Sequence, residues 1–105
     1  MTQVLLLQKM KAIKMKLFIV HAGFYDAEVG IYELHTNFLV AAEDAMAVKK
    51  RVMEKEIFKS KNMHIDAVQE INTVDGYQVT LQKDVTENTI CISYDYTQMK
   101  NLAAS

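Results

Sequence analysis

Alternating apolar and polar residues predict two strands in the first half of the chain. The apolar run KLFIVHA, which starts at Lys16, predicts a short buried strand that ends at Gly23. The segment IYELHTNFLVAA alternates, which predicts a strand with one core face and one polar face. The expected core face comprises Tyr32, Leu34, Thr36, Phe38 and Val40, and the opposite face comprises Glu33, His35, Asn37 and Leu39.

A helical spacing follows in EDAMAVKKRVMEKEIF, which predicts one main helix over residues 43–58. Asp44 is the expected N-cap, because its short carboxylate can accept from the free amides of the first turn. The predicted inward stripe is Ala45, Val48, Val52, Met53 and Ile57, with Lys49, Lys50, Glu54 and Lys55 in solvent.

The second half of the chain predicts a hairpin and a further strand. Ala67–Val74 and Tyr77–Gln82 read as two strands joined by a tight turn at Asp75-Gly76. After the polar link KDVTEN, the segment TICISYDYT alternates clearly, which predicts a fifth strand. Its apolar face is Ile90, Ile92, Tyr94 and Tyr96, opposite Cys91, Ser93 and Asp95.

These elements predict an α+β fold of order β-β-α-β-β(-β). One main helix is expected on one face of a four- to five-stranded, mainly antiparallel sheet. Residues 15–83 are expected to form a single α+β domain, and residues 84–105 a C-terminal extension with an extra strand. Residues 1–14 read as a leader, either a short amphipathic helix or an upstream extension, since Met15 is an equally good start for the domain.

Composition restricts the class of protein. At 105 residues, half of them hydrophobic, the chain is expected to fold as one small domain. The net charge of -1 gives no general attraction to nucleic acid or anionic lipid. The single cysteine, Cys91, excludes an internal disulfide and fits a reducing compartment. Neither a long apolar run nor a secretory pattern occurs, so a cytoplasmic protein without a membrane partner is expected.

Imidazoles and carboxylates form the most suggestive polar pattern. Glu33 and His35 are two apart on an expected strand and therefore point the same way, and His64 and Asp66 share that spacing. If the two pairs meet, with or without His21, they could hold a divalent metal or act as an acid–base pair. The alternative is a structural role in which these side chains bond local backbone. No standard metal-ligand spacing occurs, so neither a cofactor nor a metal is expected.

Three other features have ordinary explanations. Cys91 has no neighbour in the sequence that would make it a nucleophile. The basic run Lys49-Lys50-Arg51 is flanked by acidic residues, which favours a solvated helix face over a nucleic-acid site. Tyr94 and Tyr96 could stack on bases, but such residues more often cover a core or contact a partner chain.

Several motifs in order resemble a bacterial family of uncharacterised domains, domain of unknown function number fifteen forty-three. They are MKLFIVHAGF, ELHTNFLVAAED and HIDAVQEINTVDGYQVTL, and together they extend over about Met15 to Leu81. The matching positions are Gly23, Glu33, His35, Phe38, Val40, Ala41, His64, Asp66, Val74, Asp75, Gly76 and Tyr77. The chain departs from the pattern in having Ala22-Gly23 and no proline in the first loop, and in having one copy where relatives often have two.

The expected function is a small cytoplasmic interaction or ligand-binding module without catalysis of its own. The alternative is a metal-assisted or acid–base enzyme that uses Glu33, His35, His64 and Asp66, and a weaker third is an RNA-associated module. The chain is expected to form a homodimer, because an apolar strand left exposed would promote aggregation. The predicted interface is Ile90, Ile92, Tyr94 and Tyr96.

Overall fold

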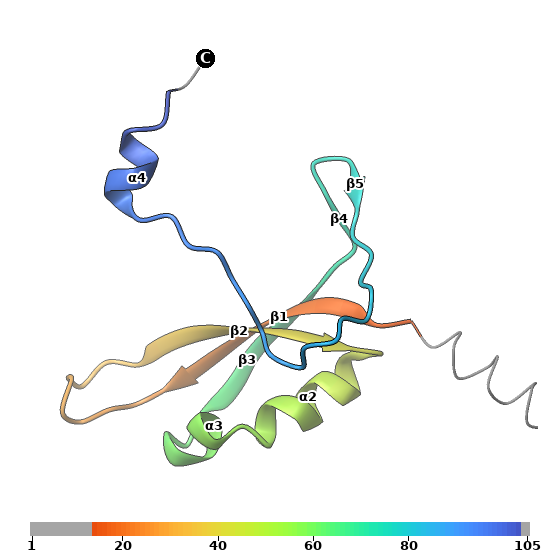
Figure 1. The fold of residues 1–105 in the computed structure, drawn as a ribbon. Helices are drawn as coiled ribbons and strands as arrows, with labels where there is room; N and C mark the ends of the chain where they lie inside the picture. The colour runs from red at the N-terminus through yellow and green to blue at the C-terminus, as the bar shows by residue number, and fades with distance from the viewer. Residues whose placement is uncertain (1–13, 104–105) are drawn as a thin grey trace, which may run out of the picture.

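The centre of the molecule is a three-stranded antiparallel sheet, seen in a computed structural model that describes residues 14–103 (Figure 1). Its strands are β1 (Lys16–Phe24), β2 (Leu34–Ala42) and β3 (His64–Ile71), in the order β2-β1-β3. The α+β class is therefore confirmed. The leader expected over residues 1–14 lies almost wholly outside the described residues.

Two helices cover one face of this sheet and form the core with it. These are α2 (Ala45–Met53) and α3 (Glu56–Ser60), which follow β2 directly. Even-numbered residues of β1 and β2 point toward them, as predicted for the face from Leu34 to Val40. Tyr32, also expected on that face, precedes β2 and is 81% exposed. The buried hydrophobic residues are Phe18, Val20, Ala22, Val40, Ala42, Val48, Val52, Phe58 and Met63.

The single main helix expected over residues 43–58 is interrupted. Asp44 caps α2 as predicted, accepting from the backbone N–H of Ala47 at 2.8 Å. The helix then ends at Glu54, and Lys55 adopts an extended conformation that starts α3. The inward residues differ from those expected: Phe58 is buried, whereas Ala45, Met53 and Ile57 are exposed. Met53 and Ile57 lie about 140° and 180° from Val48 at the helical 3.6 residues per turn, so they fall away from the face that Val48 and Val52 bury.

The hairpin forms, but it does not extend the main sheet. Strands β4 (Thr73–Val74) and β5 (Tyr77–Gln78) make a separate two-stranded sheet beyond the end of β3. Asp75 and Gly76 both have positive φ, at 51° and 85°, as the predicted tight turn requires. The main sheet thus has three strands among the described residues, and its face opposite the helices is open (Figure 1).

The predicted fifth strand is wrong. No strand is found from Thr89 to Asp95, although the residues alternate. Instead the chain leaves the sheet and ends in a short helix, α4 (Tyr96–Lys100). Asp95 and Gln98 form a capping box, a local device that starts a helix where the alternation suggested a continuing strand. Within residues 14–103, none of the helices is long and apolar enough to cross a membrane.

Candidate metal centre

The four side chains singled out in the sequence meet on the open face of the sheet. Oε1 of Glu33 lies 3.1 Å from Nε2 of His35 and 3.0 Å from Nε2 of His64. The two oxygens of Asp66 lie 3.3 Å from Nε2 of His35 and 3.0 Å from Nε2 of His64. Carboxylates and imidazoles therefore alternate around a closed ring of four side chains.

Strand register brings the two histidines together. Gly23 in the central strand pairs with His35 of β2 on one side and with His64 of β3 on the other. Both imidazoles can lean over the glycine because it has no side chain of its own. The register between β1 and β3 shifts at His21/Ala22, so that Asp66 is the additional residue of a β-bulge. Bulges commonly redirect a side chain, and this one leaves Asp66 beside His64 on the open face.

The donor atoms occupy the space that any other residue at position 23 would fill. A Cβ on Gly23 would lie 2.1 Å from Oε1 of Glu33 and 2.7 Å from both Oδ2 of Asp66 and Nε2 of His64. Three of the four side chains thus place a donor atom directly above the glycine Cα. Gly23 therefore leaves space above the sheet for these donor atoms. Any other residue at this position would fill that space with its Cβ.

Hydrogen bonding alone accounts poorly for the ring. Each Nε2 carries at most one hydrogen, so two imidazoles supply two hydrogens for four close nitrogen–oxygen contacts. The contact from Nε2 of His64 to Oε1 of Glu33 has hydrogen-bond geometry. A cation at the centre of the ring would be bound by both carboxylates and both imidazoles at once. Ligands about 2.0–2.1 Å from a tetrahedral ion are roughly 3.3 Å apart, close to the four neighbouring separations around the ring.

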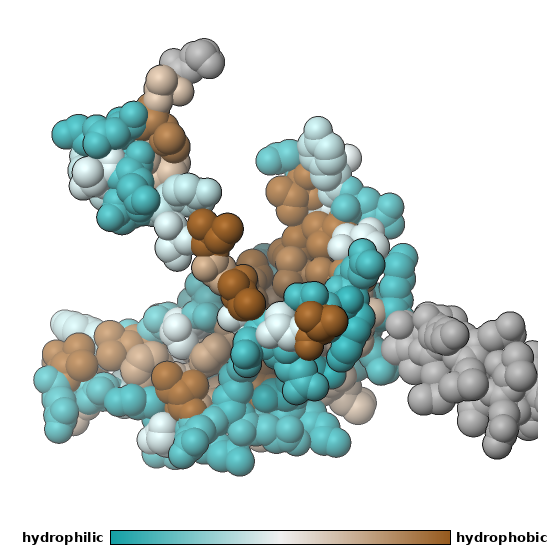
Figure 2. Space-filling view, in the orientation of Figure 1, coloured by the Kyte–Doolittle hydropathy of each residue, from teal (hydrophilic) through white to brown (hydrophobic). Residues whose placement is uncertain are grey.

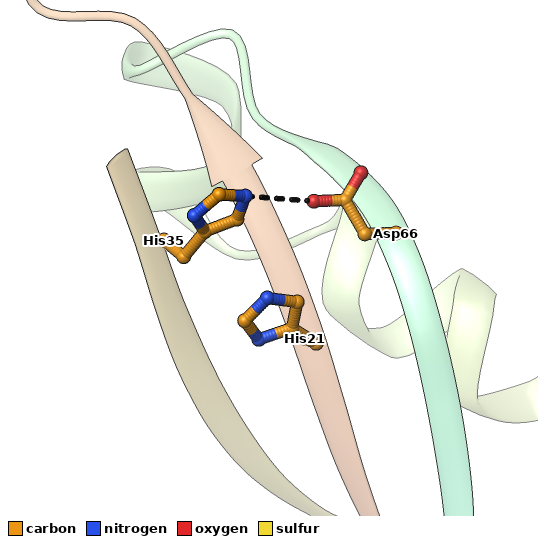
Figure 3. Close-up of side chains that lie close together, drawn as sticks. All are labelled: His21, His35 and Asp66. Atoms are coloured by element: carbon orange, nitrogen blue, oxygen red, sulfur yellow. Dashed lines mark ion pairs between the residues drawn. The ribbon is translucent and has the colours of Figure 1, made fainter. Parts of the chain in front are cut away.

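His21 supports the ring from the neighbouring position on β1. Its ring stacks on that of His35, with centroids 4.8 Å apart and planes inclined by 10° (Figure 3). Its Nδ1 donates to Oδ1 of Asn37 at 2.9 Å. The ligating atoms of His21, His35 and Asp66 lie within 4.8 Å of one another, as do those of Glu33, His64 and Asp66. The two rings lie in nearly parallel, stacked planes, so an ion in the plane of one ring lies outside the plane of the other. His21 and His35 are therefore poorly oriented to bind the same ion.

Glu33 is held in its charged form. Partial burial acts to raise its pKa, but the hydrogen bond from His64, the positive charge that His35 and His64 can carry, and the hydrogen bond from Tyr25 outweigh it. The net effect is to lower the pKa of Glu33 below its ordinary value of 4.5. The Tyr25 hydroxyl lies 3.3 Å from Oε2 of Glu33, whose charge raises the pKa of Tyr25. Glu33 is therefore an anionic ligand at neutral pH, with its second oxygen held by Tyr25.

The ring is open to solvent and separate from the grooves of the molecule. The exposed fraction of the four side chains runs from 29% for Glu33 to 48% for His64. Two open grooves lie toward the far end of β2, beside Ala41 and Arg51. None of the four ring residues lines either groove.

Sequence reasoning found the four ring residues and His21 but missed the other residues that support the ring. Asn37 accepts a hydrogen bond from His21. Its position two residues after His35, on the same strand face, was the only indication of this role in the sequence. Tyr25 lies in the loop after β1, and its contact with Glu33 has no counterpart in the local sequence pattern. The role of Gly23 depends on the register of three strands, which spacing along the chain does not give.

The comparisons with known proteins place this ring in a family context. Residues 30–81 match the family model of Domain of Unknown Function DUF1543, a segment that includes all four ring residues and stops short of Gly23 and His21. No curated protein and no solved structure matches the chain significantly. The chain therefore resembles the DUF1543 family over residues 30–81, with the matched segment present once.

Proposed function

We propose that this domain is a ligand-binding module whose ligand is a single divalent transition-metal ion. The ion is held by Glu33, His35, His64 and Asp66 on the open face of the sheet. The observation that carries the proposal is the convergence of four donor groups, at separations of 3.0–3.3 Å, over a glycine that leaves them room.

The chemistry of the donor set selects the class of ion. Imidazole nitrogens suit zinc, nickel, copper and iron, whereas magnesium and calcium prefer ligand sets made only of oxygen. Two neutral imidazoles and two carboxylates carry a charge of about -2, which a divalent ion neutralises. Zinc fits best, because it accepts a mixture of nitrogen and oxygen ligands in a tetrahedral arrangement.

The ligand number favours binding over catalysis. Catalytic zinc sites commonly keep three protein ligands and an open position, whereas four protein ligands close the coordination shell. The grooves that could hold a substrate lie elsewhere, beside Ala41 and Arg51. We therefore propose a non-catalytic binding module, as expected from the sequence. The bound metal ion is the feature that this proposal shares with the alternative of a metal-assisted enzyme.

A cytoplasmic or other reducing compartment is part of the proposal. It is supported by Cys91, whose thiol is free and exposed. A nucleic-acid partner is not part of it, because the exposed run Lys49-Lys50-Arg51 on α2 belongs to a chain of net charge -1.

Calorimetric titration with zinc tests the proposal. The chain should carry Cys91→Ser throughout, so that the free thiol does not bind zinc itself. We expect one zinc per chain, and a loss of affinity of more than about 100-fold in His64→Ala, since removing a direct ligand costs more than removing a supporting residue. Glu70→Gln is the matched control, because it removes a carboxylate of β3 that pairs with Lys16 outside the ring.

Two outcomes would contradict the proposal. One is the absence of binding in the parent chain at micromolar zinc, nickel and manganese. The other is binding that His64→Ala and Glu70→Gln weaken equally, which would identify a diffuse surface charge and not the ring as the binding site.

A further inference from the structure

The last part of the described chain, residues 87–103, forms an arm that buries none of its residues against the rest of the molecule. Every residue from Glu87 to Ala103 is exposed, and in Figure 1 the chain leaves the sheet and ends in α4 at a distance from it. The apolar residues of the arm are open to solvent, among them Ile92 at 82% and Tyr96 at 79% exposure. Figure 2 shows brown, hydrophobic patches along this segment. A stretch this apolar is usually covered in a soluble molecule.

The arm has the features of an element that docks. Ile90, Ile92 and Tyr94 alternate with Cys91, Ser93 and Asp95, the pattern of a strand with one buried face. The helix that follows has a complete capping box, yet at five residues it is too short to be stable without packing. Local sequence thus favours a strand and a helix, and neither packs against another element of the described residues.

The outer edge of β2 offers such a surface. β2 bonds to β1 on one side, and no strand of the described residues covers its other edge. The approach to the arm already lies beside this edge, because Glu87 and Thr89 line a groove with Leu39 and Val40. Phe38, next along the strand, is only partly buried, and Leu39 is 49% exposed. A free edge with apolar neighbours readily accepts another strand.

We propose that the arm docks on the β2 edge of a second copy of this chain, so that two copies exchange arms around a two-fold axis. The second copy is favoured because the arm turns away from its own β2 after Thr89, and because exchange satisfies both arms and both edges equally. Each arm would bury on the order of 400 Å² of its own surface, so a reciprocal exchange reaches about 1,600 Å², the size of a stable interface. This proposal is independent of the metal ion.

Light scattering on the full chain tests the exchange, with two variants that differ only in the face of the arm. We expect a mass twice the 12.0 kDa of one chain at micromolar concentration. Ile92→Glu places a charge on the apolar face and should shift the mass to that of one chain, whereas Ser93→Glu, on the opposite face, should leave the dimer intact. Circular dichroism should be alike for both variants, since the arm lies outside the core.

Three results would overturn the proposal. The first is a mass of one chain at all concentrations, which means that the arm folds back on its own sheet or stays free. The second is a dimer that Ile92→Glu leaves unchanged, which places the interface elsewhere. The third is equal dissociation by Ile92→Glu and Ser93→Glu, which excludes a one-sided strand.

Discussion

Gly23 shows how one residue without a side chain can determine a site. It lies in the central strand, with His35 and His64 directly in register on the two neighbouring strands. The donor atoms gather above it because nothing else occupies that space. The φ of Gly23 is not positive, so its importance lies in the room above the sheet and not in backbone freedom.

Gly23→Ala should therefore disrupt the ring without changing the backbone. The new Cβ would lie 2.1 Å from Oε1 of Glu33, so that side chain must move away. We expect zinc affinity to fall at least about tenfold and the free energy of unfolding to fall by about 1–3 kcal/mol, the usual cost of overpacking. Titration and urea denaturation measure the two effects. Gly30→Ala is the control, since no atom lies within 4 Å of its added Cβ, and equal effects in the two variants would refute the account.

Asp26 fixes the loop between β1 and β2. Its Oδ1 accepts from the backbone N–H of Glu28 at 3.0 Å, and its Oδ2 lies 3.3 Å from Nζ of Lys61. The hydrogen bond from Glu28, followed by that from Lys61, lowers the pKa of Asp26 below its ordinary value of 3.8. The unfolded chain therefore binds this proton more readily. The stabilisation is complete above pH 3.8 and is lost as the pH falls through the lowered pKa.

Asp26→Asn should consequently be less stable than the parent chain at neutral pH, and the difference should shrink in acid below pH 3.8. Urea denaturation at a series of pH values measures it. Glu28→Gln removes a neighbouring charge and controls for general electrostatics. A difference between parent and Asp26→Asn that is constant with pH would show that the carboxylate charge plays no part.

At the level of elements, the break between α2 and α3 decides which side chains build the core. The extended conformation of Lys55 ends the first helix direction and starts α3, in which Phe58 turns inward. Phe58 is 8% exposed and Ile57 is 50% exposed. On a continuous helix Ile57 would lie about 180° from Val48, so the expected inward stripe did not fit one helix, although EKEIF has no glycine or proline to mark the break.

Truncation of Phe58 and truncation of Ile57 should therefore lower the free energy of unfolding by very different amounts. Phe58→Ala should lower the free energy of unfolding by about 3–5 kcal/mol, as for other buried aromatic residues. Ile57→Ala, half exposed, should cost less than about 1 kcal/mol. Chemical denaturation of both variants provides the comparison. Similar losses, or a larger one for Ile57→Ala, would contradict the inward position of Phe58 in α3.

The strands and the polar residues were predictable to different degrees. An apolar run identified β1, alternation identified β2 and most of its core face, and Asp75-Gly76 identified the hairpin turn, because these depend on local sequence. Spacing also showed that Glu33 and His35 point the same way. That the two pairs meet depends on the register on both sides of Gly23 and on the bulge at Asp66, which are properties of three strands together. The strand expected in TICISYDYT does not form, because alternation along the sequence does not specify the edge with which a strand pairs, and Asp95 and Gln98 start a helix within the segment.

The part of the chain that the structure describes, residues 14–103, is extended for its length. Its radius of gyration is 18.3 Å, whereas a compact chain of this size has about 13 Å. The hairpin and the arm both project beyond the sheet and its two helices (Figure 1). The ring and the arm thus belong to separate parts of the molecule, and we expect their properties to be separable.

Removing residues 88–105 should leave the metal site intact. The described part of this segment is exposed throughout and lines none of the ring. We expect zinc affinity within about threefold of the parent chain, less than about 0.7 kcal/mol, measured by titration at a protein concentration where both are monomeric. A much larger loss would mean that the arm contributes to the site, which would also contradict its independence from the metal.

Anomalous diffraction from crystals grown with zinc tests the central claim most directly. Data collected on both sides of the zinc absorption edge locate the ion without reference to the protein geometry. We predict one strong peak above Gly23, about 2.0–2.2 Å from Glu33, His35, His64 and Asp66. An empty ring in crystals that hold zinc elsewhere, for example at Cys91, would contradict the account.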